Sequence, residues 1–272
     1  MLINGDSQKE LRSVQSESVD LTVTSPPYDC LRAYDGCEWN EKVFQNIADE
    51  LYRVTKKGGV VVWIVNDATV DGSETGTSFK QALYFNQIGF NIHDTMIWEK
   101  DTLMFPDAKR YPSAFEYMFV FSKGAPKTVN KICDRKNKWA GSKIHGTSRS
   151  VDGATFRKSN DKKNDVKEFG ERFNVWHLSG EKHNITGHPA PFPVQIARDH
   201  IVTWSEKGDI VMDPFMGSGS TGVACRQTQR KFIGIEISEK YFDIAKNRIE
   251  NTPYQVTLFD DFKEVSDESC FM

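Results

Sequence analysis

Short, nearly continuous apolar runs alternate along residues 19–124 with longer segments whose apolar residues recur at helical spacing. Runs dense in β-branched and aromatic residues predict buried strands, and a spacing of three to four residues predicts amphipathic helices. The predicted strands cover residues 19–25, 58–67, 91–100 and 114–124, and the predicted helices cover residues 42–56 and 77–90. Because uninterrupted apolar strands alternate with helices, we expect a mostly parallel, doubly wound α/β sheet.

The regular pattern stops near Lys123 and returns near residue 184. Between Lys123 and Lys182 the chain has fifteen Lys and Arg against seven Asp and Glu, a charge of +8, so with a net charge of −3 the remainder carries −11. This basic segment indicates a local surface for a polyanion, although a solvated face would have the same composition. One α/β domain split by a basic insertion is therefore predicted. Its halves are residues 1–122 and 184–250, with the insertion at 123–183 and a tail at 251–272.

A glycine-rich loop lies between a predicted strand and a predicted helix in the second half. Gly217, Gly219 and Gly222 have the GxGxxG spacing, and Glu236 ends the next predicted strand nineteen positions after Gly217. Such a loop lets the backbone approach a nucleotide, and an acidic residue in this place can hold ribose hydroxyls. Asp213 closes the preceding strand, and its carboxylate suits a cationic amino group better than a pyrophosphate. S-adenosylmethionine carries such an ammonium group, but a tight turn without a ligand has the same spacing.

The first predicted strand runs directly into Ser25-Pro26-Pro27-Tyr28. The two prolines fix φ and remove two backbone donors, so the strand must end in a stiff, extended turn. By itself this turn is compatible with a rigid loop that packs a tyrosine.

The motif "TSPPY" followed much later by "DPFMGSGSTG" strongly resembles the bacterial and phage DNA amino-methyltransferases that modify cytosine N4 or adenine N6. The order of the two motifs is similar to that of the circularly permuted β group. The resemblance covers about residues 1–125 and 184–250. It implies one Rossmann-like, S-adenosylmethionine-dependent methyltransferase domain, with the basic insertion as the target-recognition region for double-stranded DNA.

The resemblance assigns catalysis to the first motif. Ser25 Oγ and the Pro26 carbonyl would accept the two hydrogens of the target amino group and aim its lone pair at the methyl carbon, while Pro27 stiffens the turn. Tyr28 would stack on a base flipped out of the duplex. Trp98 would pack against the same base, although an ordinary core tryptophan fits equally well.

The same resemblance assigns cofactor contacts to both halves. Asp6 would lie near the adenine, although a helix cap is an equal alternative, and Pro189 near the methionine end. The remaining cofactor candidates are Asp213, Phe215, Gly217, Gly219, Ser220, Thr221 and Glu236. The candidates for DNA contact in the insertion are Arg157, Lys158, Lys162 and Lys163.

Ser25 favours cytosine N4 as the target, because adenine-modifying members usually carry Asp or Asn in its place. The alternatives are adenine N6, a catalytically inactive DNA-binding protein, and a methyltransferase for RNA or protein amides. A nicotinamide enzyme is disfavoured because the glycine loop lies late in the chain.

The remaining composition limits the cellular setting. The five cysteines are scattered and not spaced as metal ligands, which predicts reduced thiols and no metal site. No apolar run reaches about 18 residues, and "MLINGDSQKE" has no secretion signal. We expect a cytoplasmic, bacterial or phage-encoded protein that acts on DNA away from membranes. A cognate restriction endonuclease and a homodimer are both compatible with the sequence.

Overall fold

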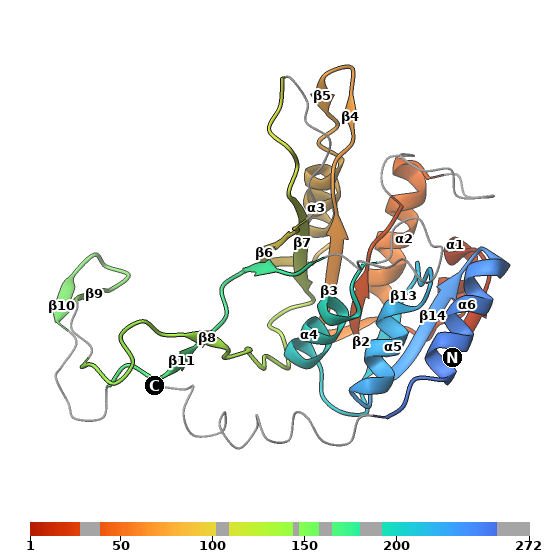
Figure 1. Ribbon diagram of the computed structural model, residues 1–272. Coiled ribbons are helices and arrows are strands. Elements are labelled where there is room, and N and C mark those ends of the chain that lie inside the picture. Colours follow the sequence, from red (N-terminus) through yellow and green to blue (C-terminus); the bar gives the residue numbers. More distant parts are fainter. Residues whose placement is uncertain (28–38, 102–108, 144–146, 158–164, 180–191, 255–272) are drawn as a thin grey trace. The chain divides into compact units, whose positions relative to one another are not determined.

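The computed structural model describes residues 1–27, 39–101, 109–143, 147–157, 165–179 and 192–254 (Figure 1). The chain forms two compact units, which we describe separately. The first combines Met1–Asn130 with the described residues from Asn174 onward, and the second is Lys131–Phe173. The second unit is narrower than the predicted insertion, because residues 123–130 and 174–179 belong to the first.

The first unit is built on an eight-stranded sheet in the order β1-β14-β13-β2-β3-β7-β6-β12. Among its strands, β7 alone pairs antiparallel with its neighbours, so the predicted α/β class with a mostly parallel sheet is confirmed. In chain order the strands are β1 (Leu2–Asn4), β2 (Val19–Thr24), β3 (Thr55–Val65), β6 (Asn91–Glu99), β7 (Phe115–Ser122), β12 (Val175–His177), β13 (Ile210–Asp213) and β14 (Lys231–Glu236).

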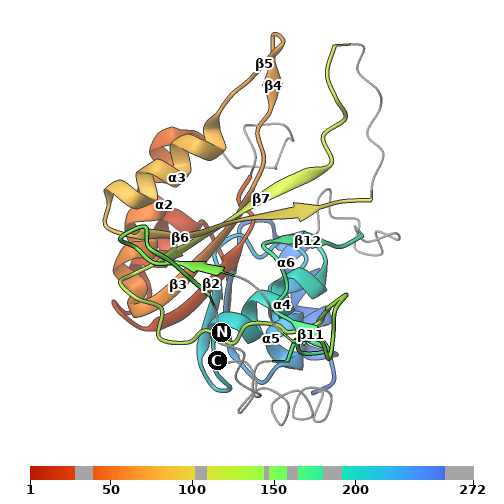
Figure 2. The ribbon, with the colours of Figure 1, turned by 90° about the vertical axis from the view of Figure 1, so that its left-hand side faces the viewer.

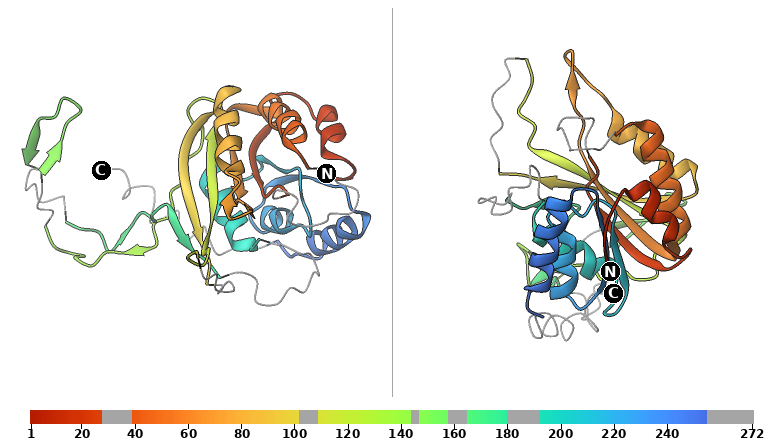
Figure 3. Two further views of the ribbon diagram at one scale, coloured as in Figure 1. Left: turned by 90° about the horizontal axis from the view of Figure 1, so that it is seen from above. Right: turned by 90° about the vertical axis from the view of Figure 1, so that its right-hand side faces the viewer.

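Helices cover both faces of this sheet (Figures 2 and 3). One face carries α1 (Ser7–Glu10), the 3-10 turn η1 (Leu11–Ser13), α2 (Glu41–Val54) and α3 (Thr77–Gln87); the other carries α4 (Val194–Trp204), α5 (Ser220–Gln227) and α6 (Glu239–Glu250). No helix in the described part of the chain has the length and apolar composition needed to cross a bilayer.

Each face has its own hydrophobic cluster because successive residues of a strand point to opposite sides. In β3, Val61 and Trp63 pack towards α2 and α3, whereas Val62 and Ile64 pack towards α4 and α5. All four are buried. This double burial explains why the strand reads as one unbroken apolar run.

The predicted end of the second helix was wrong. We expected Gly58 and Gly59 to stop a helix at residue 56, but α2 ends at Val54 and both glycines lie within β3. Gly58 adopts φ +82°, and the pairing of β2 with β3 shifts register between Val19 and Leu21. A Cβ on Gly59 would lie 2.9 Å from the Asp20 carbonyl oxygen. The glycines therefore serve a close approach of two strands rather than a helix end.

The second unit contains short paired strands. Its strand β8 (Arg135–Lys136) pairs with β11 (Phe169–Gly170), and β9 (Thr147–Arg149) pairs with β10 (Thr155–Arg157). Ion pairs join Lys131 to Glu171 and Arg172 to Asp134.

Candidate active site at the carboxyl edge of the sheet

Three neighbouring parallel strands end together at one edge of the sheet. β13 lies between β14 and β2, so its last residue Asp213 is flanked by Glu236 at the end of β14 and by Ser25 immediately after β2. The carboxyl ends of parallel strands are where α/β proteins bind ligands. The two motifs, far apart in sequence, therefore meet at one edge.

Asp213 is 1% exposed and accepts its described hydrogen bonds from neutral donors. Oδ1 accepts from the Thr24 hydroxyl at 2.6 Å and from the Phe215 N–H at 3.0 Å, and Oδ2 accepts from the Thr221 hydroxyl at 2.8 Å. Burial raises the pKa of Asp213 to about 6, against the opposing effect of these three bonds. Each carboxylate oxygen has two lone pairs, so Oδ2 retains room for another donor.

Glu236 is held by the backbone of the loops around it. Oε2 accepts from the Gly217 N–H at 2.8 Å, and Oε1 accepts from the Ser238 N–H at 2.9 Å. Burial raises the pKa of Glu236, and backbone hydrogen bonds from Ser238, Gly217 and Ile237 oppose the rise. Two carboxylate oxygens have about four lone pairs in all, so these bonds leave acceptor capacity for a hydroxyl donor.

The three glycines of the loop have different structural reasons. Gly217 and Gly219 adopt φ +53° and +87°, conformations that glycine tolerates best, and Gly219 caps α5. Gly222 lies inside α5, where a Cβ would lie 2.3 Å from Ile249 Cδ1 of α6. The first two glycines therefore shape the turn, and the third allows two helices to pack.

Ser220 begins α5 beside the two carboxylates and is 4% exposed. Its hydroxyl has no hydrogen-bond partner among the described residues. An unsatisfied buried hydroxyl costs free energy, so it marks a position where a ligand atom would be stabilising.

The strand that carries Ser25 is bonded directly to the glycine loop. Thr24 donates to Asp213, and the Thr221 hydroxyl lies 3.2 Å from the carbonyl oxygen of Val23. Ser25 is half-buried and Pro26 is buried at the same edge. Thr24 was missed in our sequence analysis, although its position beside the motif was a usable signal.

Other predicted residues have separate contacts. The Asp6 carboxylate caps α1 by accepting from the Gln8 N–H at 3.0 Å. The Phe215 ring packs edge-on against Trp39 at 5.4 Å, in the cluster under α2. These contacts give both residues a structural role next to the site.

Trp98 lies in β6, separated from β2 by β3 and β7. It is 4% exposed, and its indole N–H donates to the Leu178 carbonyl at 2.9 Å. The Lys100 ammonium lies 4.6 Å from the ring centroid. Trp98 is thus a core residue in this structure, and the structure does not bring it next to Ser25.

Several predictions lie outside what the structure describes. Tyr28, Pro189, Lys158, Lys162 and Lys163 fall in segments that are not described, and for Arg157 only the backbone of β10 is described.

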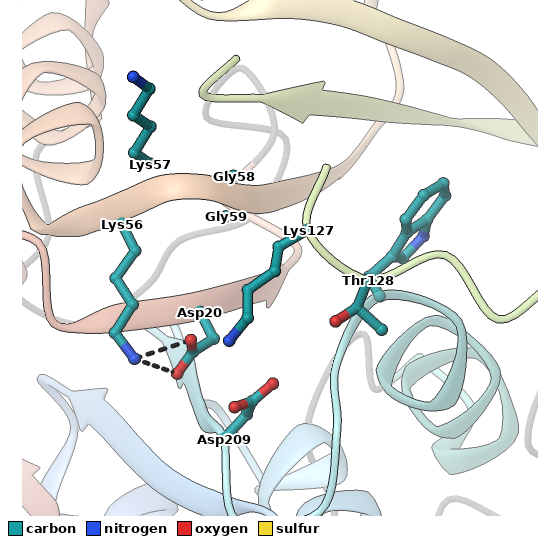
Figure 4. A pocket seen from close by; sticks show the side chains of 9 residues that line it. Asp20, Lys56, Lys57, Gly58, Gly59, Lys127, Thr128 and Asp209 are labelled. Carbon is teal, nitrogen blue, oxygen red and sulfur yellow. Dashed lines mark hydrogen bonds and ion pairs between the residues drawn. The ribbon is translucent and has the colours of Figure 1, made fainter. Parts of the chain in front are cut away.

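The opposite, amino edge of the sheet contains a cavity of about 20 Å³ (Figure 4). Asp20 of β2 and Lys56 of β3 line it, and Lys56 Nζ lies 2.7 Å from each carboxylate oxygen of Asp20. Asp20 Oδ2 also accepts from the Ile210 N–H at 3.0 Å. This cluster satisfies its own charges, so we assign it a structural role.

Known proteins share the pattern of this chain. The sequence model of the N6_N4_Mtase family, described as DNA methylase, matches residues 19–247. The chain belongs to this family. It is therefore a DNA methyltransferase of the N6/N4 type.

Two relatives illustrate the range of the family. The orphan methyltransferase M.BamHII of Bacillus amyloliquefaciens is 55% identical over 242 residues, which cover 86% of this chain and 89% of the relative. The DNA adenine methyltransferase YhdJ of Escherichia coli (strain K12) is 30% identical over 263 residues, which cover 92% of this chain and 82% of the relative.

Two solved structures share the fold of this DNA methyltransferase. The cytosine-N4-specific PvuII DNA methyltransferase aligns with a TM-score of 0.65 at 19% identity, covering 97% of this chain and 90% of that chain. A DNA modification methylase from Thermus thermophilus, TTHA0409, solved with S-adenosyl-L-methionine, aligns with a TM-score of 0.62 at 24% identity, covering 93% and 94%.

Proposed function

We propose that this DNA methyltransferase moves a methyl group from S-adenosylmethionine to the exocyclic amino group of a base flipped out of double-stranded DNA. One observation carries the proposal. The residue before Ser25, Thr24, donates a hydrogen bond to Asp213 at 2.6 Å, so the catalytic turn and the cofactor carboxylate are held at one edge.

The cofactor assignment is supported by the free acceptor capacity of the site. Asp213 would bind the cationic methionine end, because among the described residues no Lys or Arg influences its charge. Glu236 would accept from the ribose hydroxyls, and the Ser220 hydroxyl would gain a partner. When bound, S-adenosylmethionine supplies an activated methyl group. The chain's residues hold and orient it.

The catalytic assignment rests on the turn after β2. Ser25 Oγ and the Pro26 carbonyl would accept the two amino hydrogens of the target, which directs the nitrogen lone pair towards the methyl carbon. The two prolines fix the direction of the carbonyl, so little reorganisation is needed in the transition state. Tyr28 would stack on the flipped base.

We propose cytosine N4 as the target atom. The support is Ser25, since adenine-modifying members of the family usually carry Asp or Asn there. Adenine N6 is the second candidate, favoured by the likeness to YhdJ, whose name states an adenine activity.

Nucleoside mass spectrometry distinguishes the two bases. DNA from cells expressing the protein should contain N4-methylcytosine, and modification-sensitive sequencing should give its sequence context. N6-methyladenine alone would refute the choice of base but not the activity. DNA without either modified base would refute the proposed function, provided that cells expressing a Ser25→Ala variant serve as the matched blank.

We also propose that the basic insertion binds the DNA backbone. Replacing Arg157 and Lys158, or Lys162 and Lys163, by Ala should lower DNA affinity and reduce the slope of its salt dependence by about two. Cofactor affinity should stay unchanged. A salt slope untouched by both double substitutions would show that the insertion is only a solvated segment.

The name of the 55% identical relative, an orphan methyltransferase, favours a further proposal. We propose that this chain acts without a dedicated restriction endonuclease. Its expression in a host that lacks any endonuclease for the modified sequence should still methylate DNA fully, which sequencing of the modified sites would measure.

A further inference from the structure

A small hairpin prolongs β3 beyond the carboxyl edge of the sheet (Figures 1 and 2). It consists of β4 (Thr69–Val70) and β5 (Ser73–Glu74), paired antiparallel. All four residues are exposed, and the Val70 side chain is 56% exposed. A two-stranded hairpin without a buried face is marginally stable alone, so other contacts must hold it.

The tip of the hairpin is preorganised. Asp71 and Gly72 form its two-residue loop with φ +49° and +77°, the left-handed pair typical of the primed turns that fit a twisted hairpin. Arg110, from the segment before β7, donates to the Gly72 carbonyl and lies 3.8 Å from Glu74. The tip therefore has little freedom to lose on binding.

The base of the hairpin is fixed by one carboxylate. Asp67 accepts from the Ser78 N–H at 2.8 Å and from the Ser78 hydroxyl at 2.6 Å, which ties the end of β3 to the first turn of α3. The Thr75 N–H donates to the Ala68 carbonyl at 3.0 Å and closes the base. The hairpin is thus a stiff projection on a firm mount.

The position of the hairpin follows from the strand order. β2, which carries Ser25, has β13 and the glycine loop on one side and β3 on the other. The hairpin therefore rises beside the catalytic turn, on the side away from the cofactor loop. A duplex that delivers a base to Ser25 from beyond this edge meets the hairpin next to the target.

We propose that the hairpin tip inserts Val70 into the duplex beside the flipped base. Apolar side chains inserted between base steps offset lost stacking. The Asp71 carboxylate at the tip favours a groove over the phosphates, because it would be repelled by the backbone but can accept from a base amino group. This proposal rests on the proposed function, since it concerns the same flipped base.

The test compares single-turnover methyl transfer by wild type, Val70→Ala and the matched control Val129→Ala. Val129 is a 37% exposed valine next to Thr128, which lines the amino-edge cavity far from the hairpin. The probes are a duplex carrying the sequence found by modification mapping and the same duplex with a mismatch opposite the target base. The mismatched base is already cheap to flip.

Val70→Ala should slow transfer about tenfold on the paired duplex, since flipping costs a few kcal/mol, and less than about twofold on the mismatched one. Val129→Ala should match wild type on both. A wild-type rate for Val70→Ala on the paired duplex would overturn the proposal, as would equal slowing on both duplexes. A changed sedimentation coefficient with unchanged transfer would instead assign the tip to a protein contact. Failure of the wild type on both duplexes would remove the proposed function itself.

Discussion

Two buried carboxylates, Asp20 near the start of β2 and Asp213 at the end of β13, lie at opposite edges of the same sheet. Asp20 is 7% exposed and held by a cation, with Lys56 Nζ at 2.7 Å from both of its oxygens. Asp213 is 1% exposed and held by two hydroxyls and one backbone N–H. The first has its counter-ion within the chain, and the second has only neutral donors among the described residues.

This difference separates a structural carboxylate from one available to a ligand. An ion pair satisfies its charge and has little to gain from a further cation. A carboxylate held only by neutral donors keeps its charge uncompensated, and burial raises its pKa to about 6. Neutralising that charge with a bound cation is therefore favourable. The comparison assigns ligand binding to the carboxyl edge and stability to the amino edge.

The largest effect should come from Ser25→Ala at the carboxyl edge. Removal of one preorganised acceptor should cut the methyl-transfer rate about 10²–10³-fold. DNA and cofactor affinities should change little, because other contacts provide ground-state binding. Single-turnover assays with saturating cofactor measure this rate, and a wild-type rate would show that Ser25 is not an acceptor in the reaction.

A paired substitution tests the two carboxylates directly. Asp213→Asn should weaken S-adenosylmethionine binding by about 1.5–3 kcal/mol, because a hydrogen bond to a charged group is lost. Asp20→Asn should leave that affinity unchanged and lower the free energy of unfolding instead. Titration calorimetry and urea unfolding on both variants measure the two quantities. Equal loss of cofactor affinity in both would abolish the distinction between the edges.

The pH dependence sharpens the same distinction. A cationic ligand prefers ionised Asp213, so affinity for S-adenosylmethionine should fall up to about tenfold per pH unit below the pKa of about 6. Asp213→Asn should flatten this profile. A flat profile in the wild type would show that no charge on Asp213 is used.

The shifted pKa of Asp213 also affects stability. The folded state binds this proton more tightly than the unfolded chain, whose carboxyl titrates near 3.8. The resulting stabilisation is therefore fully present below about pH 4 and is lost as the pH rises through about 6. Urea unfolding of the wild type and Asp213→Asn across this range measures it.

The smallest effect should come from Lys56→Met at the amino edge. Loss of the ammonium leaves the Asp20 carboxylate unpaired, and the free energy of unfolding should fall by about 1–2 kcal/mol, since Lys56 is partly solvated. Lys57→Met is the matched control, because Lys57 points away from Asp20 (Figure 4). Loss of stability in the control alone would contradict the assignment.

The sequence was informative where one local pattern decides the structure. The apolar runs predicted β2, β3, β6 and β7 because much of each strand is buried within the sheet. The strand–loop–helix context of Gly217 and Gly219 predicted the turn, since their φ values demand glycine. The meeting of Asp213, Glu236 and Ser25 at one edge follows from the strand order together with parallel pairing.

The sequence failed where distant contacts decide. Nothing near Val175–His177 signals a strand, because β12 exists through its pairing with β6. Gly58 was a plausible helix stop, but the approach of β2 requires it in a strand. The neutral surroundings of Asp213 were equally hidden, since Thr24 lies 189 residues away along the chain.

The order of the strands also has a consequence for synthesis. β1 pairs with β14, and the Asn4 side chain donates to the Glu236 carbonyl 232 residues later. β13 fills the place between β14 and β2, so β1 and β2 cannot join one sheet until both late strands have left the ribosome. Such late closure gives the fold a high contact order and slow formation. A nascent chain therefore carries its catalytic turn long before it has a cofactor site, and methylation cannot begin until translation has passed Glu236.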